Sequence, residues 1–211
     1  MRVARDMKAS IIAIGSEMLG TTRVDTNSLK ITAALEDHGV ELVRKAVVGD
    51  TLAEIVDEIG FSLDRSDFLV TTGGLGPTED DLTRDALAKK FELQKEVDQS
   101  IIDSIEARFA ARGWKMPEVN KRQGQVFRGQ TTLRNERGTA PGFRLNVGTK
   151  TVWVFPGVPH ELVRARVAWC VSLSPAPTAP TPMTAAPTGR SSPAVSATAS
   201  PPSTATTSPV T

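Results

Sequence analysis

TTGGLGPTEDD, residues 71–81, joins an apolar run to a stretch with helical character. The run Phe68–Thr71 suits a strand buried on both faces, and residues 78–90 are expected to form the helix that follows. Open α/β sheets place their ligands at such strand-to-helix junctions. The glycines let the backbone approach a phosphate closely, and a helix N-terminus supplies free N–H groups and partial positive charge. Taken alone, the glycine pattern fits equally well a tight connection between a strand and a helix that binds no ligand.

The chain before this stretch repeats the same alternation of strand and helix. Ser10–Ile14 is a short apolar run typical of a buried strand, and residues 26–38 read as a helix that ends at Gly39. Residues 40–48 are rich in β-formers, and residues 52–63 carry apolar side chains at helical spacing. This rhythm predicts parallel βαβ units with right-handed crossovers.

The chain after the glycines is less regular. Residues 97–111 are expected to form a helix, and Thr131–Leu133 and Thr151–Phe155 are short β-like pieces in a small β-rich excursion. A final helix is expected after Pro159. The sequence therefore predicts a three-layer α/β/α fold with a mostly parallel sheet.

Composition excludes several classes of protein. The 24 acidic and 25 basic residues nearly balance, so neither nucleic acid nor an anionic membrane is expected as partner. Cys170 is the only cysteine, which rules out an internal disulfide and a thiolate metal cluster. The first residues lack the apolar core of a signal peptide, and no apolar run approaches the roughly 20 residues that span a bilayer. We expect a soluble, cytoplasmic protein.

The composition changes after about Arg166, and we expect a folded domain over residues 8–170 followed by a disordered tail over residues 171–211. The tail is almost wholly Ser, Thr, Pro and Ala, which cannot bury enough apolar surface to offset the entropy of ordering. A genuine linker and a shifted reading frame would both give this composition, so both interpretations stay open.

Three aspartates are candidate ligands of a divalent cation. Asp80 and Asp81 follow the glycines, and Asp50 ends the preceding strand, on the same rim of a parallel sheet. Carboxylates are the hard oxygen ligands that magnesium takes together with phosphate oxygens. Each also has a structural alternative, because acids favour the first turn of a helix and Asp50 suits a helix N-cap.

The segment TTGGLGPTEDDLTRDA, residues 71–86, resembles the signature of the MoaB/Mog-type molybdopterin-binding domain and is most similar to the N-terminal domain of CinA, the competence/damage-inducible protein family. Three further motifs agree in order: IGSEMLG-x4-DTN at residues 14–27, GTAPGF at 138–143 and FPGVPHE at 155–161. The resemblance covers roughly residues 8–165. It implies the same α/β fold and a homo-oligomer.

The resemblance also implies a site. Asp50 and Asp81 correspond by position to the aspartates that serve adenylylation of molybdopterin in Mog relatives, and CinA-type domains are associated with metal-dependent cleavage of ADP-ribose. Asp50, Asp80 and Asp81 would hold magnesium, manganese or cobalt. The substrate-binding residues implied in the same way are Glu17, Asp25, Asn27, Gly73, Gly74, Gly76, Gly138, Thr139, Pro156, Gly157 and Glu161. Structural alternatives are helix capping for Asp25 and Asn27, turn geometry for the Pro-Gly loops and a solvated loop acid at Glu17.

The sequence departs from the CinA pattern in two places. An N-x-K-Q stretch before GTAPG reads Asn120-Lys121-Arg122-Gln123 here, and neither basic residue is assigned a catalytic role. The chain also turns into the Ser/Thr/Pro/Ala tail where full-length relatives continue, so no amidohydrolase activity is expected.

Three functions remain open at this stage. The first is metal-dependent hydrolysis of a nucleoside diphosphate linkage, with ADP-ribose as substrate. The second is molybdopterin binding or adenylylation, and the third is a truncated or frameshifted product without activity. Either active form would have a small nucleotide or pterin as its partner.

Overall fold

The computed structural model describes residues 7–21 and 23–159, and its first half alternates strands and helices. The elements of this half are β1 (Lys8–Ile14), a 3-10 turn η2 (Ser16–Met18), α1 (Thr26–Asp37), β2 (Glu41–Val48), α2 (Leu52–Leu63) and β3 (Phe68–Thr72). These bounds confirm the predicted βαβ units to within two residues, the largest difference being β1, which begins at Lys8 and not at Ser10. Gly39 follows α1 with a φ of 70°, the left-handed conformation that stops a helix without strain only at glycine.

The second half supplies the rest of the sheet and a separate small unit. Its elements are α3 (Thr83–Phe91), β4 (Lys95–Val97), α4 (Gln99–Ala110), η3 (Glu118–Gly124), β5 (Gln125–Phe127), β6 (Thr131–Leu133), β7 (Gly142–Val147) and β8 (Lys150–Phe155). β4 and β5 pair antiparallel in a two-stranded sheet of their own.

The main sheet has the order β2-β1-β3-β8-β7-β6. β2, β1, β3 and β8 run parallel, and β7 and β6 add antiparallel to β8. Ile14 pairs with Val48 and Thr72 with Phe155, so the carboxyl ends of all four parallel strands meet at one edge of the sheet. The mostly parallel sheet is therefore confirmed, with two antiparallel strands at one side.

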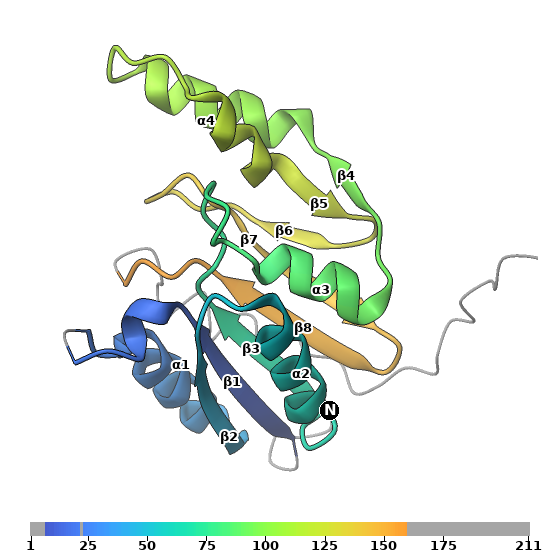
Figure 1. Ribbon diagram of the computed structural model, residues 1–211. Coiled ribbons are helices and arrows are strands. Elements are labelled where there is room, and N and C mark those ends of the chain that lie inside the picture. The colour runs from blue at the N-terminus through green and yellow to red at the C-terminus, as the bar shows by residue number, and fades with distance from the viewer. Residues whose placement is uncertain (1–6, 22, 160–211) are drawn as a thin grey trace, which may run out of the picture. The chain divides into compact units, whose positions relative to one another are not determined.

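Helices cover both faces of this sheet, which confirms the three layers (Figure 1). On one face α1 places Ile31 and Leu35 in a core with Ile11, Val70 and Trp153. On the other, α2 and α3 pack apolar side chains against the strands; the buried members include Ile12, Ile55, Ile59, Leu69, Leu87 and Val154. Burial on both faces explains why β1 and β3 read as continuous apolar runs.

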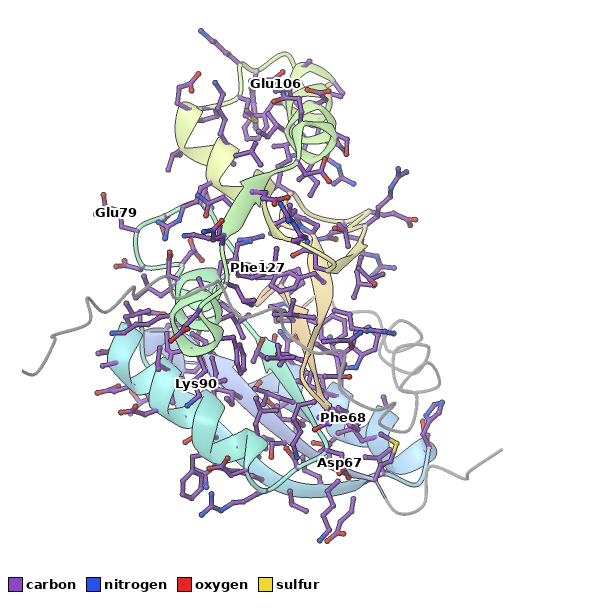
Figure 2. The ribbon with its side chains drawn as sticks, turned by 90° about the vertical axis from the view of Figure 1, so that its right-hand side faces the viewer. Asp67, Phe68, Glu79, Lys90, Glu106 and Phe127 are labelled. Atoms are coloured by element: carbon purple, nitrogen blue, oxygen red, sulfur yellow. The ribbon has the colours of Figure 1, made fainter. Side chains whose placement is uncertain are left out.

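The expectation of a small β-rich excursion late in the chain was wrong. The late β-rich region is no excursion, because β6, β7 and β8 complete the main sheet, while the excursion is formed by β4, α4, η3 and β5. Phe127 of β5 packs edge-on against Phe143 of β7, with ring centroids 5.9 Å apart, and points into the interior in Figure 2. Short strands whose partners lie far away in sequence carry little local signal.

The third helix begins at Thr83 and not at Thr78. Residues 78–81 instead form a turn closed by the Asp81 side chain, while Thr83 N–H donates to the Gly74 carbonyl at 3.2 Å. Glu79, in this turn, projects outward from the ribbon (Figure 2). The expected helix after Pro159, Glu161 and the tail at residues 171–211 lie outside the described residues. Within residues 7–21 and 23–159, no helix is long and apolar enough to cross a membrane.

Candidate functional site

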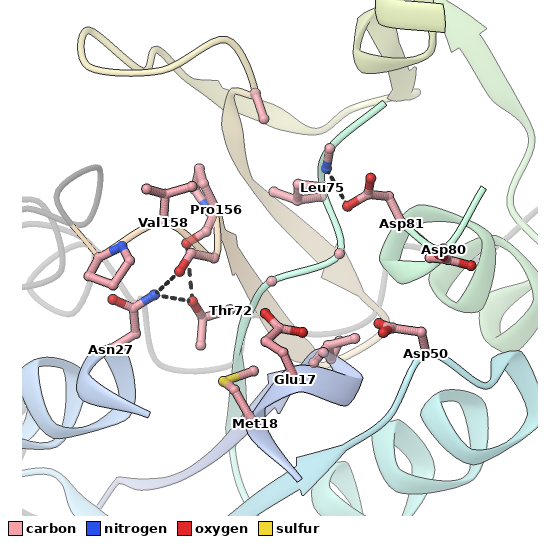
Figure 3. A pocket seen from close by; sticks show the side chains of 18 of the residues that line it. Glu17, Met18, Asn27, Asp50, Thr72, Leu75, Asp80, Asp81, Pro156 and Val158 are labelled. Atoms are coloured by element: carbon pink, nitrogen blue, oxygen red, sulfur yellow. Dashed lines mark hydrogen bonds between the residues drawn. The ribbon is translucent and has the colours of Figure 1, made fainter. Parts of the chain in front are cut away.

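A cavity of about 550 Å³ opens at the edge where the four parallel strands end (Figure 3). Its walls come from the loops after β1, β2, β3 and β8, together with residues of the GTAPG loop and η3. The structure brings together there these residues predicted from the sequence: Glu17, Asp25, Asn27, Asp50, Gly73, Gly74, Gly76, Asp80, Asp81, Thr139, Pro156 and Gly157. Strand order thus gathers motifs that are up to 140 residues apart in the chain (Gly157 and Glu17).

Gly73 and Gly74 are required by the packing of the loop itself. Gly73 has a φ of 104°, and a Cβ there would lie 2.0 Å from the Ile14 carbonyl oxygen. Gly74 has a φ of 61°, and its Cβ would lie 2.3 Å from Thr83 Oγ1. Thr83 Oγ1 donates to the Gly73 carbonyl at 2.8 Å, which fastens the loop to the start of α3. The structural interpretation of these glycines is therefore sufficient to explain them, whatever the loop binds.

Two N–H groups of the loop donate to no acceptor within residues 7–21 and 23–159. The carbonyls of Gly73 and Gly74 both accept from Thr83. In a planar trans peptide the next N–H points away from the carbonyl, so the N–H groups of Gly74 and Leu75 are directed away from Thr83. Neither donates a hydrogen bond to any described residue. Consecutive backbone N–H donors in a pocket wall are the kind of group that proteins use to bind anions.

Asp81 is bound within the loop. Its Oδ1 accepts from Gly76 N–H at 2.7 Å, and its Oδ2 accepts from Thr78 N–H at 2.8 Å and from Thr78 Oγ1 at 2.6 Å. A Cβ on Gly76 would lie 2.5 Å from Oδ2. The alternative that Asp81 lies in the first turn of a helix is wrong, because α3 begins two residues later, at Thr83. Asp81 closes a turn in the pocket wall (Figure 3).

Asp50 joins the ends of β1 and β2. Its Oδ2 accepts from Ser16 N–H at 2.8 Å, and its own N–H donates to Ser16 Oγ at 2.9 Å. The alternative of a helix N-cap is wrong, because Thr51 is the cap of α2 and makes no side-chain cap bond. The second oxygen of Asp50 accepts no hydrogen bond from a described residue, and the carboxylate faces the cavity in Figure 3.

The carboxylates of the cavity suit one cation that also binds phosphate oxygens of a ligand. Among the described residues, no group of three or more His, Cys, Asp or Glu side chains could by itself hold a metal ion. Magnesium needs only one or two carboxylates when phosphate oxygens and water supply the rest. Asp50 and the exposed Asp80 have oxygens free of described donors, whereas both oxygens of Asp81 already accept hydrogen bonds within the loop.

Asn27 connects β3 and the loop after β8. Its Nδ2 donates to Thr72 Oγ1 at 2.9 Å and to the Gly157 carbonyl at 2.8 Å, as drawn in Figure 3. Its Oδ1 is buried and accepts from no described residue. Asp25 is the N-cap of α1, accepting from Ser28 N–H at 2.9 Å, so the capping interpretation is confirmed for it. Its other oxygen is also buried without a described partner.

Other residues of the site were missed or lie elsewhere. Arg23 and the nearly buried Gln123 line the cavity, and neither was predicted to. Gln123 belongs to the N-x-K-Q stretch of the CinA pattern, and that motif was the signal in the sequence that could have placed it in the site. Gly138 is not among the lining residues; its carbonyl accepts from Arg108 and its N–H donates to Asn135.

Arg84 lies behind the glycine loop as a buried cation, 4% exposed. Its Nη1 donates to the Leu75 carbonyl at 3.1 Å. Burial lowers the pKa of the Arg84 guanidinium to about 10, partly offset by the charge of Asp81, so the group stays protonated at neutral pH. A positive charge is thus fixed behind the loop that carries the free N–H groups.

Comparison with known proteins agrees with this arrangement. Residues 10–176 match the family model described as "Probable molybdopterin binding domain". The protein CinA of unknown function from Thermoplasma acidophilum superposes with a TM-score of 0.70 at 32% identity, over 79% of this chain and 96% of that one. This chain belongs to the CinA-like members of the molybdopterin-binding domain family.

Among the curated relatives, CinA-like proteins from Solibacter usitatus and Koribacter versatilis are 47% and 40% identical to the chain. Each match covers 74% of this chain but only 38% and 39% of the relative, so the chain spans about two fifths of their length. MoaB from Thermus thermophilus, at 19% identity and a TM-score of 0.50 over 79% of this chain and 91% of that one, shows a shared fold.

Proposed function

We propose that the cavity binds a nucleoside diphosphate together with a divalent cation and hydrolyses the diphosphate linkage, with ADP-ribose as substrate. The observation that carries this proposal is the pair of N–H groups at Gly74 and Leu75, which donate to no described residue, backed by the buried charge of Arg84. Fixed dipoles of this kind bind phosphate oxygens and stabilise charge that develops on them during the reaction.

The charge of the cavity explains why a cation is needed. Among the described residues, five acidic side chains line it, Glu17, Asp25, Asp50, Asp80 and Asp81, against one base, Arg23. A diphosphate would be repelled by this lining unless a cation neutralised it. Asp50 and Asp80 are the side chains that would hold the ion, which when bound supplies charge neutralisation and lowers the pKa of a water molecule.

The reaction is a displacement at phosphorus. A water oxygen attacks one phosphorus of ADP-ribose, the bridging P–O bond breaks, and AMP and ribose 5-phosphate leave with the proton released to solvent. The loop N–H groups would hold the non-bridging oxygens. Asn27 and Asp25, whose buried oxygens lack described partners, would accept from N–H or O–H groups of the nucleoside.

The test is AMP release from ADP-ribose with magnesium, manganese or cobalt, comparing the wild-type protein with Asp50→Asn. An amide binds Mg²⁺ more weakly than a carboxylate, so we expect metal-dependent release that falls by about 100-fold or more in the variant. Asp57→Asn, on the exposed side of α2, is the matched control and should keep full activity. No release from a wild-type protein that melts cooperatively would refute the hydrolase.

The family match favours a second candidate, the binding or adenylylation of molybdopterin. It would use the same loop N–H groups and cation, because the ligand also carries phosphate. Titration with a fluorescent pterin phosphate separates the two functions: saturable quenching without AMP release from ADP-ribose would support the pterin.

A further inference from the structure

Arg122 ties the excursion to the glycine loop. From η3 its Nη1 donates to the Thr78 carbonyl at 2.8 Å, and its Nη2 lies 3.4 Å from the Asp81 carbonyl. The same Nη2 contacts Asp85 Oδ2 at 2.5 Å. These partners are 37 to 44 residues away in the chain. Arg122 does not line the cavity itself, so it cannot serve as a direct ligand of phosphate in this arrangement.

The turn that Arg122 holds is one wall of the cavity. Pro77, Thr78, Asp80 and Asp81 all line it, and Asp81 closes the turn from within. Arg122 binds the backbone of the same turn at the two ends of the segment Thr78–Asp81. A planar guanidinium can reach two carbonyls and a carboxylate at once, which an ammonium group cannot do with the same geometry.

Asp85 fixes the guanidinium in place. This carboxylate on α3 also pairs with Lys95 of β4, and both cations come from the excursion side of the chain. Burial acts to raise the pKa of Asp85, but hydrogen bonds from Lys95 and Arg122 outweigh it and lower the pKa, so the carboxylate is charged at neutral pH. The adjacent residue Gln123 reaches the cavity, so η3 contributes to the site by two neighbouring side chains.

We propose that Arg122 is a positioning residue: by holding the Thr78 and Asp81 carbonyls, it keeps the turn of the glycine loop in the form that binds a diphosphate. The expected effect on KM for ADP-ribose rests on the proposed function, whereas the expected effect on the order of the turn does not. Without the clamp, the described contacts that remain across the turn are those between Asp81 and Thr78, and the ligand must order the rest on binding. The cost falls on binding and hardly on the chemical step.

The experiment compares Arg122→Gln and Arg122→Lys with the neighbouring control Lys121→Gln. Lys121 is exposed and pairs with Glu118, and no contact with the turn joins it within the described residues, so the control removes a charge next to the clamp without touching the turn. Amide hydrogen exchange of residues 76–82 is measured without ligand. KM and kcat for ADP-ribose with magnesium are measured in parallel, and the Kd for inorganic pyrophosphate with magnesium is measured by calorimetry.

Arg122→Gln is expected to speed amide exchange at residues 76–82. It should raise KM and the pyrophosphate Kd about tenfold, which is the effect of losing one charged hydrogen bond. The kcat should stay within about twofold of the wild-type value. Arg122→Lys should recover part of both changes, and Lys121→Gln should match the wild type. If Arg122→Gln unfolds the protein, Arg122→Lys carries the same comparison.

Unchanged exchange and unchanged KM and Kd in a folded Arg122 variant would overturn the proposal. A loss confined to kcat and melting temperature would also overturn it, since that is the signature of a role in stability alone. If the wild type releases no AMP, the proposed hydrolase fails, while exchange and pyrophosphate binding still decide the role of Arg122.

Discussion

Substituting Gly74 by alanine tests the architecture of the glycine loop. Gly74 has a φ of 61°, and the new methyl would lie 2.3 Å from Thr83 Oγ1. Holding alanine in the left-handed region costs about 1 kcal/mol. The hydroxyl must also turn away from the Gly73 carbonyl, and losing that buried hydrogen bond adds about 1–3 kcal/mol. We therefore expect Gly74→Ala to lower the free energy of unfolding by about 2–4 kcal/mol.

Gly148→Ala is the matched control, because Gly148 has a φ of 57° and, apart from its own chain neighbours, no described atom lies within 4 Å of the added Cβ. It should lose only the conformational part, about 1 kcal/mol. Urea denaturation of both variants gives the two losses, and an unchanged slope shows that the comparison is valid. Removing the hydroxyl with Thr83→Ala should abolish most of the extra cost of Gly74→Ala. Equal losses at positions 74 and 148, within about 0.5 kcal/mol, would refute the packing argument.

Two further predictions concern polar contacts. A hydrogen bond from Arg44 lowers the pKa of Glu58 below its usual 4.5, so the pair stabilises the protein above that pH and the contribution is lost as the pH falls below it. The free energy of unfolding, measured by urea denaturation from pH 7 to 3, should therefore depend less on pH in Glu58→Gln than in the control Glu54→Gln. An equal pH dependence in the two variants would contradict this. Asn27→Asp should destabilise by about 3 kcal/mol at pH 7, since a carboxylate replaces the donor to Thr72 and Gly157. That loss should shrink at acid pH, where the new carboxyl is protonated and can donate; a pH-independent loss would contradict the assigned hydrogen bonds.

The alternating half of the fold was predictable from the sequence because its signals are local. The strands β1 and β3 are apolar runs buried on both faces, and Gly39 marks the end of α1. The strand β6 was predicted with its observed bounds, whereas β7 was missed, because a six-residue strand that follows a glycine- and proline-rich turn gives little local signal.

The site was predictable as a set of loops, but not in its details. The motifs at Gly73 and Asn27 do meet at one edge of the sheet, as parallel topology requires. The sequence could not indicate that the carboxylate of Asp81 accepts hydrogen bonds from Gly76 and Thr78. An aspartate at this position suits a hydrogen-bonded turn and a metal site equally well. Arg122 was ambiguous for a similar reason, since its role depends on contacts more than 35 residues away.

The most direct test of the account follows the backbone N–H groups of Gly74 and Leu75 by nuclear magnetic resonance. ADP-ribose is added to labelled protein with and without magnesium. The account predicts that these two amide signals shift strongly and saturably when magnesium is present and much less without it, while the signal of Gly148 stays in place. Saturable binding that leaves both amides unmoved, or no binding by a folded protein, would contradict the claim that this loop holds a diphosphate.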